Sequence, residues 1–269
     1  MKARVGRAVV LMAAAILLAS GAWSQDQGRE FHWSGKLTAN QLLEIKNING
    51  DIDAKSASGA EAQVTAVKSG PQADQVRIEV VPTSEGVTIC AVYPSSFFSG
   101  GGSRHCESGD EHSSNGHGDS TKVHFTVSVP QGVRFAGMNV NGNITAEDMQ
   151  APIQANTVNG SVRVSTTEWA EINTVNGRVY ASMGDAAWNG SLKVASVNGS
   201  IELRMPDDLN AEVSFNSVNG SMSSEFPLNV TNDWPVGHHA DGKIGNGGRR
   251  LLIETVNGSV QLRKGAGGV

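Results

Sequence analysis

Histidine, cysteine and acidic residues gather in one segment of the chain, SRHCESGDEHSSNGHGDSTKVH, which begins at Ser103. Imidazole, thiolate and carboxylate groups are ligands for zinc, nickel or copper, so His105, His112 and His117 are candidate metal ligands. Their spacing matches no recognised metal motif, and glycine and serine surround them. We therefore expect an exposed surface loop and no bound cofactor.

Neighbouring carboxylates are the second group that could do chemistry. Glycoside hydrolysis needs two acids about 5–10 Å apart across a sugar site. The candidates are pairs only by their closeness in sequence: Asp207-Asp208, Glu147-Asp148 and Glu168-Glu171. The sequence contains no G-x-S-x-G, H-E-x-x-H or phosphate-binding motif. We expect a non-catalytic protein, with a polysaccharide-acting enzyme as the alternative.

Three tryptophans, Trp169, Trp188 and Trp234, could form a sugar-stacking surface. The chain has few aromatic residues, 5% in all, which favours a buried or end-capping role for each. His238 and His239, in PVGHHADG, receive the same interpretation as the other histidines, as surface residues.

The first 24 residues have the features of a secretory signal. Lys2, Arg4 and Arg7 precede an apolar run over residues 8–19, and Ala22-Trp23-Ser24 offers small residues where a signal peptidase cleaves. We expect export to the periplasm, the cell surface or the medium, with a mature chain that begins near Gln25. An uncleaved signal is the alternative, and no integral membrane segment is expected after cleavage.

The charge balance restricts the class of partner. Without residues 1–24 the chain keeps 18 basic and 26 acidic residues, a net charge of −8. Binding to nucleic acid needs clustered lysine and arginine, and attraction to anionic lipid needs the same. We therefore expect an envelope protein or a glycan as partner, and no nucleic acid.

The chain has two cysteines, Cys90 and Cys106. Oxidising conditions outside the cytoplasm favour a disulfide between them. They bracket a Gly/Ser-rich insertion, and a bond would close a loop of about 15 residues. We predict the Cys90–Cys106 disulfide, with a free or metal-binding pair as the alternative.

The elements that position these residues are predicted by a motif that occurs seven times, with TVNGSV as its commonest form. From the second copy to the last, successive glycines are 18, 17, 22, 21 and 38 residues apart, so the last gap resembles two units of which one lacks the motif. A period near 20 indicates a repeat architecture. The turn residues are Asn49-Gly50, Asn141-Gly142, Asn159-Gly160, Asn176-Gly177, Asn198-Gly199, Asn219-Gly220 and Asn257-Gly258.

Apolar residues alternate on both sides of each turn, as in β-strands. Relative to the glycine they occupy positions −7, −5, +2 and +4, while −3 is usually Thr or Ser and −2 is always Val or Ile. A chain of antiparallel hairpins, for which Asn-Gly is the strongest short signal, would expose that valine row. A β-solenoid of coils of about 20 residues would instead turn the valines inside the corners and stack the asparagines into a hydrogen-bonded ladder.

We therefore predict an all-β fold built as a β-solenoid with Asn-Gly corners, with an antiparallel hairpin-rich sheet or sandwich as the alternative. Asn-Gly is expected to supply positive φ angles at each corner. The expected organisation is a signal at 1–24, an irregular β region at 25–135 with a Cys-bracketed loop at 91–121, the repeats at 136–264 and a flexible tail at 265–269.

Several motifs in order resemble the bacterial putative-adhesin family, also described as β-strand-repeat proteins of unknown function. They are VHFTVSVPQGV at Val123–Val133, then NVNGNITAED and the TVNGSV units, and later LRMPDDLNAEVSFNSVNGSM and IGNGGRRLLIETVNGSVQLRK. The resemblance covers nearly all of the predicted mature chain. It implies an adhesion or interaction scaffold and supplies no catalytic residues.

Overall fold

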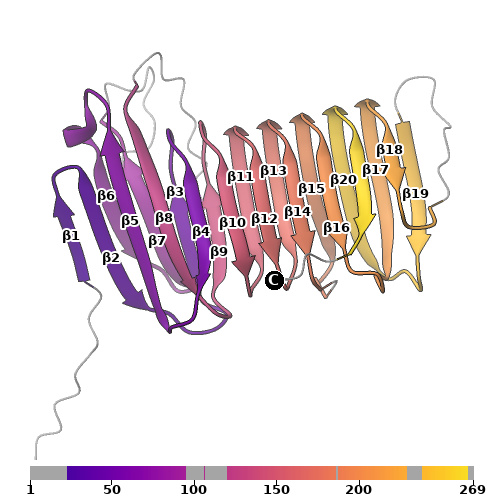
Figure 1. The fold of residues 1–269 in the computed structure, drawn as a ribbon, viewed down its shortest axis with the longest axis horizontal. Helices are drawn as coiled ribbons and strands as arrows, with labels where there is room; N and C mark the ends of the chain where they lie inside the picture. The colour runs from indigo at the N-terminus through magenta and orange to yellow at the C-terminus, as the bar shows by residue number, and fades with distance from the viewer. Residues whose placement is uncertain (1–22, 95–105, 107–119, 186, 229–237, 266–269) are drawn as a thin grey trace, which may run out of the picture.

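The computed structural model describes residues 23–94, 106, 120–185, 187–228 and 238–265. These residues form two sheets that lie face to face along the long axis of the molecule (Figure 1), together with one short 3-10 helix, Ala73–Gln75. Sheet A has eleven strands in the spatial order β1-β2-β5-β8-β4-β10-β12-β14-β16-β21-β18, and sheet B has ten in the order β19-β17-β20-β15-β13-β11-β9-β3-β7-β6. The prediction of an all-β fold is confirmed.

The strands are short, as the closely spaced turns require. In sheet A they are β1 (Trp23–Gln27), β2 (Glu30–Lys36), β4 (Ile52–Ala57), β5 (Glu61–Ser69), β8 (Lys122–Pro130), β10 (Ile144–Met149), β12 (Val162–Thr166), β14 (Val179–Met183), β16 (Ile201–Met205), β18 (Met222–Ser224) and β21 (Val260–Lys264). In sheet B they are β3 (Leu42–Lys46), β6 (Arg77–Pro82), β7 (Gly86–Val92), β9 (Arg134–Met138), β11 (Ile153–Asn159), β13 (Ala170–Asn176), β15 (Ser191–Asn198), β17 (Ala211–Asn219), β19 (His238–Ile244) and β20 (Arg249–Asn257).

Each Asn-Gly turn joins a strand of sheet B to the next strand of sheet A. For example, β11 lies in sheet B and β12, which follows Asn159-Gly160, lies in sheet A. Equivalent strands of neighbouring units pair in parallel, with Ile172 opposite Val194 and Val179 opposite Ile201. The hairpin alternative is therefore wrong for the repeats, because a hairpin turn joins antiparallel neighbours within one sheet.

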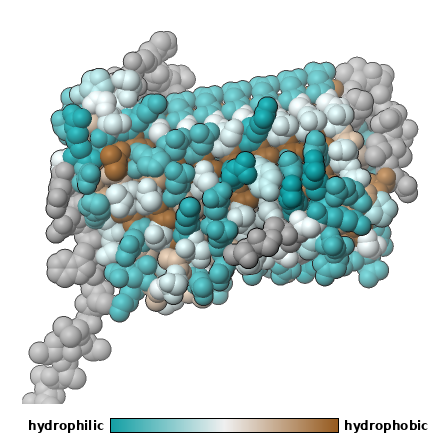
Figure 2. Space-filling model, viewed as in Figure 1, coloured by the Kyte–Doolittle hydropathy of each residue, from teal (hydrophilic) through white to brown (hydrophobic). Residues whose placement is uncertain are grey.

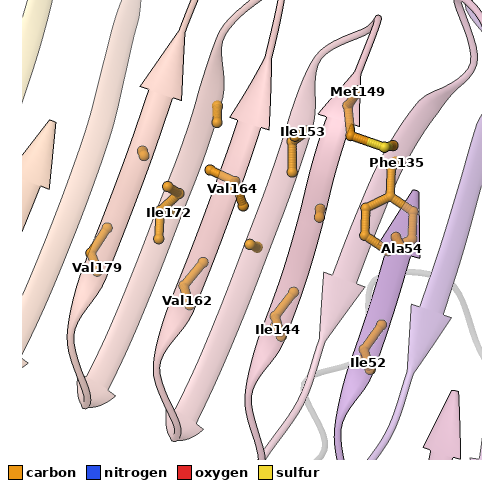
Figure 3. Packing of buried hydrophobic residues seen from close by; sticks show 14 of the residues in the cluster. Ile52, Ala54, Phe135, Ile144, Met149, Ile153, Val162, Val164, Ile172 and Val179 are labelled. Atoms are coloured by element: carbon orange, nitrogen blue, oxygen red, sulfur yellow. The ribbon is translucent and has the colours of Figure 1, made fainter. Parts of the chain in front are cut away.

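The core lies between the two sheets and consists of rows of like residues. Ile52, Ile144, Val162 and Val179 occupy the same register on four successive strands (Figure 3). All the residues predicted at positions −7 and −5 are buried, and so are those at +2 and +4, except Met222, which is partly buried. Burial of these side chains, about 1.5–3 kcal/mol for each large one, is the main stabilising term.

The spatial order of the units differs from their order in the sequence at the C-terminal end. The strands β20 and β21, which come last in the chain, insert between the β15–β16 unit and the β17–β18 unit. The strand β19 precedes them and pairs antiparallel with the outer edge of β17. The described residues of the 38-residue gap therefore form an antiparallel edge strand in place of the expected motif-less coil.

The N-terminal end repeats this arrangement. The strands β3 and β4, from the first Asn-Gly unit, insert between β7–β8 and β9–β10. Beyond β8, antiparallel pairing through β5 and β2 to β1 extends sheet A. The strand β1 includes Trp23 and Ser24, the last two residues of the predicted signal; residues 1–22 lie outside the described residues.

The seven asparagines at position −1 form one continuous ladder. In their spatial order along the stack, the side-chain amide of every asparagine after Asn49 donates to the Oδ1 of the asparagine before it, at N···O distances of 2.7–2.9 Å. A spacing of about 4.8 Å between strands gives the ladder a length of about 29 Å. Its spatial order is Asn49, Asn141, Asn159, Asn176, Asn198, Asn257 and Asn219. Figure 2 shows a regular hydrophilic row along one long edge of the molecule.

Positions −3 and −2 have the opposite orientation to the one predicted. Thr174, at −3, is 4% exposed, and its hydroxyl donates to the carbonyl oxygen of Gly160 at 3.0 Å. The equivalent hydroxyls of Thr157, Ser196 and Thr255 each donate to the carbonyl oxygen of the motif glycine in the adjacent coil. Val175, at −2, is 38% exposed, so the predicted inward corner valine is wrong. A buried carbonyl needs a hydrogen-bond donor, and the inward hydroxyl supplies it.

The expectation of a positive φ at every corner is also wrong. Among the described motif residues only Gly50 and Gly142 have φ in the left-handed range, at 112° and 155°. At Gly177 the requirement is space, because an added Cβ would fall on the carbonyl oxygen of Gly160. Close stacking of the backbone, rather than turn conformation, therefore selects glycine at most corners.

Candidate interaction surface

The outer face of sheet A carries a cluster of charged and aromatic residues on neighbouring strands. Position +3 places Arg163 on β12, Tyr180 on β14 and Glu202 on β16 in one register row. Position +5 places Arg204 on β16 beside Arg263 on β21. Strands alternate their side chains between faces, and the residues between these, such as Ala181 and Leu203, are buried. We call these five outward residues the arginine–tyrosine cluster.

The tyrosine ring is the centre of this cluster. The guanidinium carbon of Arg163 lies 4.6 Å from the ring centroid of Tyr180, and that of Arg204 lies 5.8 Å from it. Both distances fall within the range of cation–π attraction. The Tyr180 ring therefore lies close to two arginine side chains on the outer face of sheet A.

The carboxylate of Glu202 forms ion pairs with two of the three arginines. Arg204 Nη2 lies 3.2 Å from Glu202 Oε1, and Arg263 Nε lies 3.5 Å from the same oxygen. Arg263 Nη2 also donates to Gln261 at 2.6 Å. The side chains of the three ion-paired residues are 31–42% exposed, so water screens their attraction. The five residues of the cluster together carry an excess of two positive charges.

The sequence interpretation missed this cluster because it stopped at the apolar positions. The same count from each glycine, extended to +3 and +5, would have placed the five residues on one face. Figure 2 shows strongly hydrophilic side chains standing out from the middle of the face in view.

A row of exposed valines runs along the outer face of sheet B, next to the asparagine ladder. Its members are at position −2 and are 37–47% exposed: Val158, Val175, Val197, Val256 and Val218. The two equivalent residues at the N-terminal end, Ile48 and Val140, are buried. The row is thus apolar and accessible over five of its seven positions.

The disulfide lies at the end where that row is buried. Cys90, on β7, is bonded to Cys106, with their Cα atoms 5.7 Å apart, and both residues are buried. Cys90 is the register partner of Lys46 on β3. The Lys46 side chain is fully buried, and its Nζ lies 3.9 Å from Glu44 Oε1. The buried ion pair and the buried cysteines show that the outer face of sheet B is covered here.

The candidate metal ligands His105, His112 and His117 lie outside the described residues. Among the residues that are described, no group of three or more His, Cys, Asp or Glu could hold a metal ion. His239 contacts Asn216 and Asp241, each at 2.6 Å. A hydrogen bond from Ser214, with His239 as a lesser cause, lowers the pKa of the Asp241 carboxyl. This network attaches β19 to β17.

Members of two of the candidate carboxylate pairs lie on different sheets. Glu147 lies on β10 in sheet A, whereas Glu171 lies on β13 in sheet B, and their sequence neighbours Ala146 and Ile172 are buried in the core between the sheets. Their side chains therefore point to opposite outer faces of the molecule. Asp148 has a φ of 57° at an irregularity of β10, and its backbone N–H donates to Ser165 Oγ at 2.8 Å.

The tryptophans divide between two environments. Trp188 is buried, and its indole N–H donates to the carbonyl of Arg250 at 3.0 Å. Trp169 is partly buried against the core, and Trp234 lies outside the described residues. Trp188 has the buried role that its sequence favoured, so it offers no surface for a sugar.

The comparisons with known proteins identify the family. The model of the Toastrack DUF4097 family matches residues 30–263, which is most of the chain. The chain belongs to the Toastrack DUF4097 family. The family assignment agrees with the resemblance drawn from the repeated motifs. No curated protein matches the chain.

Solved structures with a similar fold are distant in sequence. One is that of a "putative cell adhesion protein" from Clostridium sporogenes, at 8% identity and a TM-score of 0.43, which covers 87% of this chain and 99% of that one. Another is that of a "putative adhesin" from Bacteroides fragilis, at 11% identity and a TM-score of 0.36, covering 88% and 98%. In the described part of this Toastrack chain, no helix has the length and hydrophobicity to cross a membrane.

Proposed function

We propose that this chain is an exported, non-catalytic protein of the cell envelope whose β-solenoid serves as a scaffold for adhesion or interaction. The observation that carries the proposal is the in-register stack of seven Asn-Gly units, joined by an unbroken asparagine ladder. Such a stack is rigid and presents long, flat faces on which side chains recur at the strand spacing.

Two further observations support the proposal. The outer faces carry accessible groups, the arginine–tyrosine cluster on sheet A and the valine row on sheet B, on opposite sides of the molecule. The disulfide between Cys90 and Cys106 is in keeping with export.

The proposal is tested by fractionating cells that make the native chain and by measuring binding of the purified mature protein to the native envelope. We expect the protein outside the cytoplasm, and saturable retention on the envelope fraction. Polysaccharides incubated with the protein should show no new reducing ends. A cytoplasmic location, or turnover of a polysaccharide, would contradict the proposal.

A further inference from the structure

The arginine–tyrosine cluster has a charge that the composition of the chain does not explain. The whole sequence has a net charge of −5, yet this patch holds three guanidinium groups and one carboxylate. Arg204 and Arg263 are direct register partners on adjacent strands. Like charges directly opposite each other on a sheet are destabilising, and the single carboxylate of Glu202 offsets only part of this repulsion. The arrangement therefore favours an additional anion.

The donors of the cluster are also oriented for such an anion. A guanidinium group stacked on a ring keeps its N–H groups along its edge, where they can bind a carboxylate or sulfate through two parallel hydrogen bonds. Arg163 stacks on Tyr180 in this way and, within the described residues, has no acidic partner. Its donors are open to a ligand.

The dimensions of the cluster indicate a polymer. Arg163 lies on β12 and Arg263 on β21, three strands apart in sheet A, so their backbones are separated by about 14 Å. Small ligands are held in concave pockets, whereas this cluster lies on the outer face of a sheet. Several separated anions on one extended chain would engage the arginines together and gain avidity.

We propose that the arginine–tyrosine cluster binds an acidic polysaccharide, whose carboxylate or sulfate groups pair with Arg163, Arg204 and Arg263. This rests on the proposed interaction scaffold and adds the class of its ligand. Nucleic acid is the less favoured polyanion because the remainder of the chain is acidic and repels a continuous line of phosphates.

The test uses the full mature chain and immobilised polygalacturonate or heparin, with neutral dextran as the reference surface. We expect binding to one or both acidic polymers, weakened by salt, and none to dextran. The double variant Arg163→Gln/Arg263→Gln should bind at least about tenfold more weakly, since each loses a charge-assisted contact. The control Arg250→Gln, an exposed arginine on sheet B, should bind as the parent does.

Three outcomes would overturn the proposal. The first is equal weakening by the control and the double variant, with native circular dichroism for both. The second is binding to single-stranded DNA but to neither acidic polysaccharide. The third is retention on the native envelope that the double variant leaves unchanged, in which case the proposed scaffold function stands and only its ligand class fails. If the parent chain itself is not retained on the envelope fraction, the proposed scaffold function is contradicted as well.

Discussion

At the scale of single residues, the buried side chain at position −3 is polar and the exposed side chain at position −2 is apolar, the reverse of what hydropathy alone predicts. Strand alternation from the buried residues at −7 and −5 puts −3 inside, and the structure follows that alternation. A threonine can lie there because its hydroxyl completes the hydrogen bonding of a carbonyl in the next coil. The valine at −2 is outside, where β-branched residues still favour the strand and pack on their equivalents in the adjacent coils.

The two positions can be compared directly by substitution. Thr174→Val keeps the shape of the side chain but leaves the Gly160 carbonyl without its hydroxyl donor, so we expect a loss of about 1–3 kcal/mol. Val175→Asp changes an exposed position and should cost about 0.5 kcal/mol. Chemical denaturation of both variants checks this order. A greater loss of unfolding free energy for Val175→Asp than for Thr174→Val would indicate that Val175 faces inward.

Gly177 should tolerate no side chain. Gly177→Ala places a Cβ on the carbonyl oxygen of Gly160, so the coils must move apart, and we expect a loss of several kcal/mol or failure to fold. Gly59→Ala is the matched control, because the nearest atom to its added Cβ is 3.9 Å away. Thermal unfolding of the pair measures the difference, and similar melting temperatures would show that the coils are less closely stacked.

At the scale of elements, the sequence predicts the strands and the turns but not their partners. The period of the motif specifies which residues form each coil, since the alternation at −7, −5, +2 and +4 is local. The insertion of β20–β21 between two earlier units is determined by tertiary packing, because coils with the same corner can stack on one another in more than one order. Because all the corners are nearly identical, the sequence alone does not rank those choices.

The disulfide belongs to this scale because it links Cys106 to Cys90 on β7, 16 residues earlier in the sequence. We expect mass spectrometry of the purified protein to show Cys90 linked to Cys106 and no free thiol. Closing a loop of about 15 residues is worth about 3 kcal/mol in the chain-entropy model, so reduction should lower the free energy of unfolding by about that amount. Two free thiols in the purified protein would contradict the assignment.

At the scale of the whole molecule, the same repeated corner gives both the shape and the candidate binding faces. The asparagine ladder, the buried hydroxyl row and the valine row all run along the stack. Counting from each glycine predicts that the five residues of the arginine–tyrosine cluster share one face, but not that Arg263 lies beside Arg204, because β21 inserts out of sequence order. The chemistry of the cluster therefore depends on the spatial order of the coils.

Cross-linking of the valine row tests the order most directly. Parallel neighbours have Cα atoms about 4.8 Å apart, within reach of a disulfide, whereas next-but-one neighbours are about 9.6 Å apart and beyond it. The chain is made with cysteines at Val197 and Val256, and separately at Val197 and Val218, and each is mildly oxidised. We predict a new disulfide for Val197→Cys/Val256→Cys and none for Val197→Cys/Val218→Cys, because β20 separates β15 from β17. The reverse result would show that the coils stack in sequence order and would contradict the account.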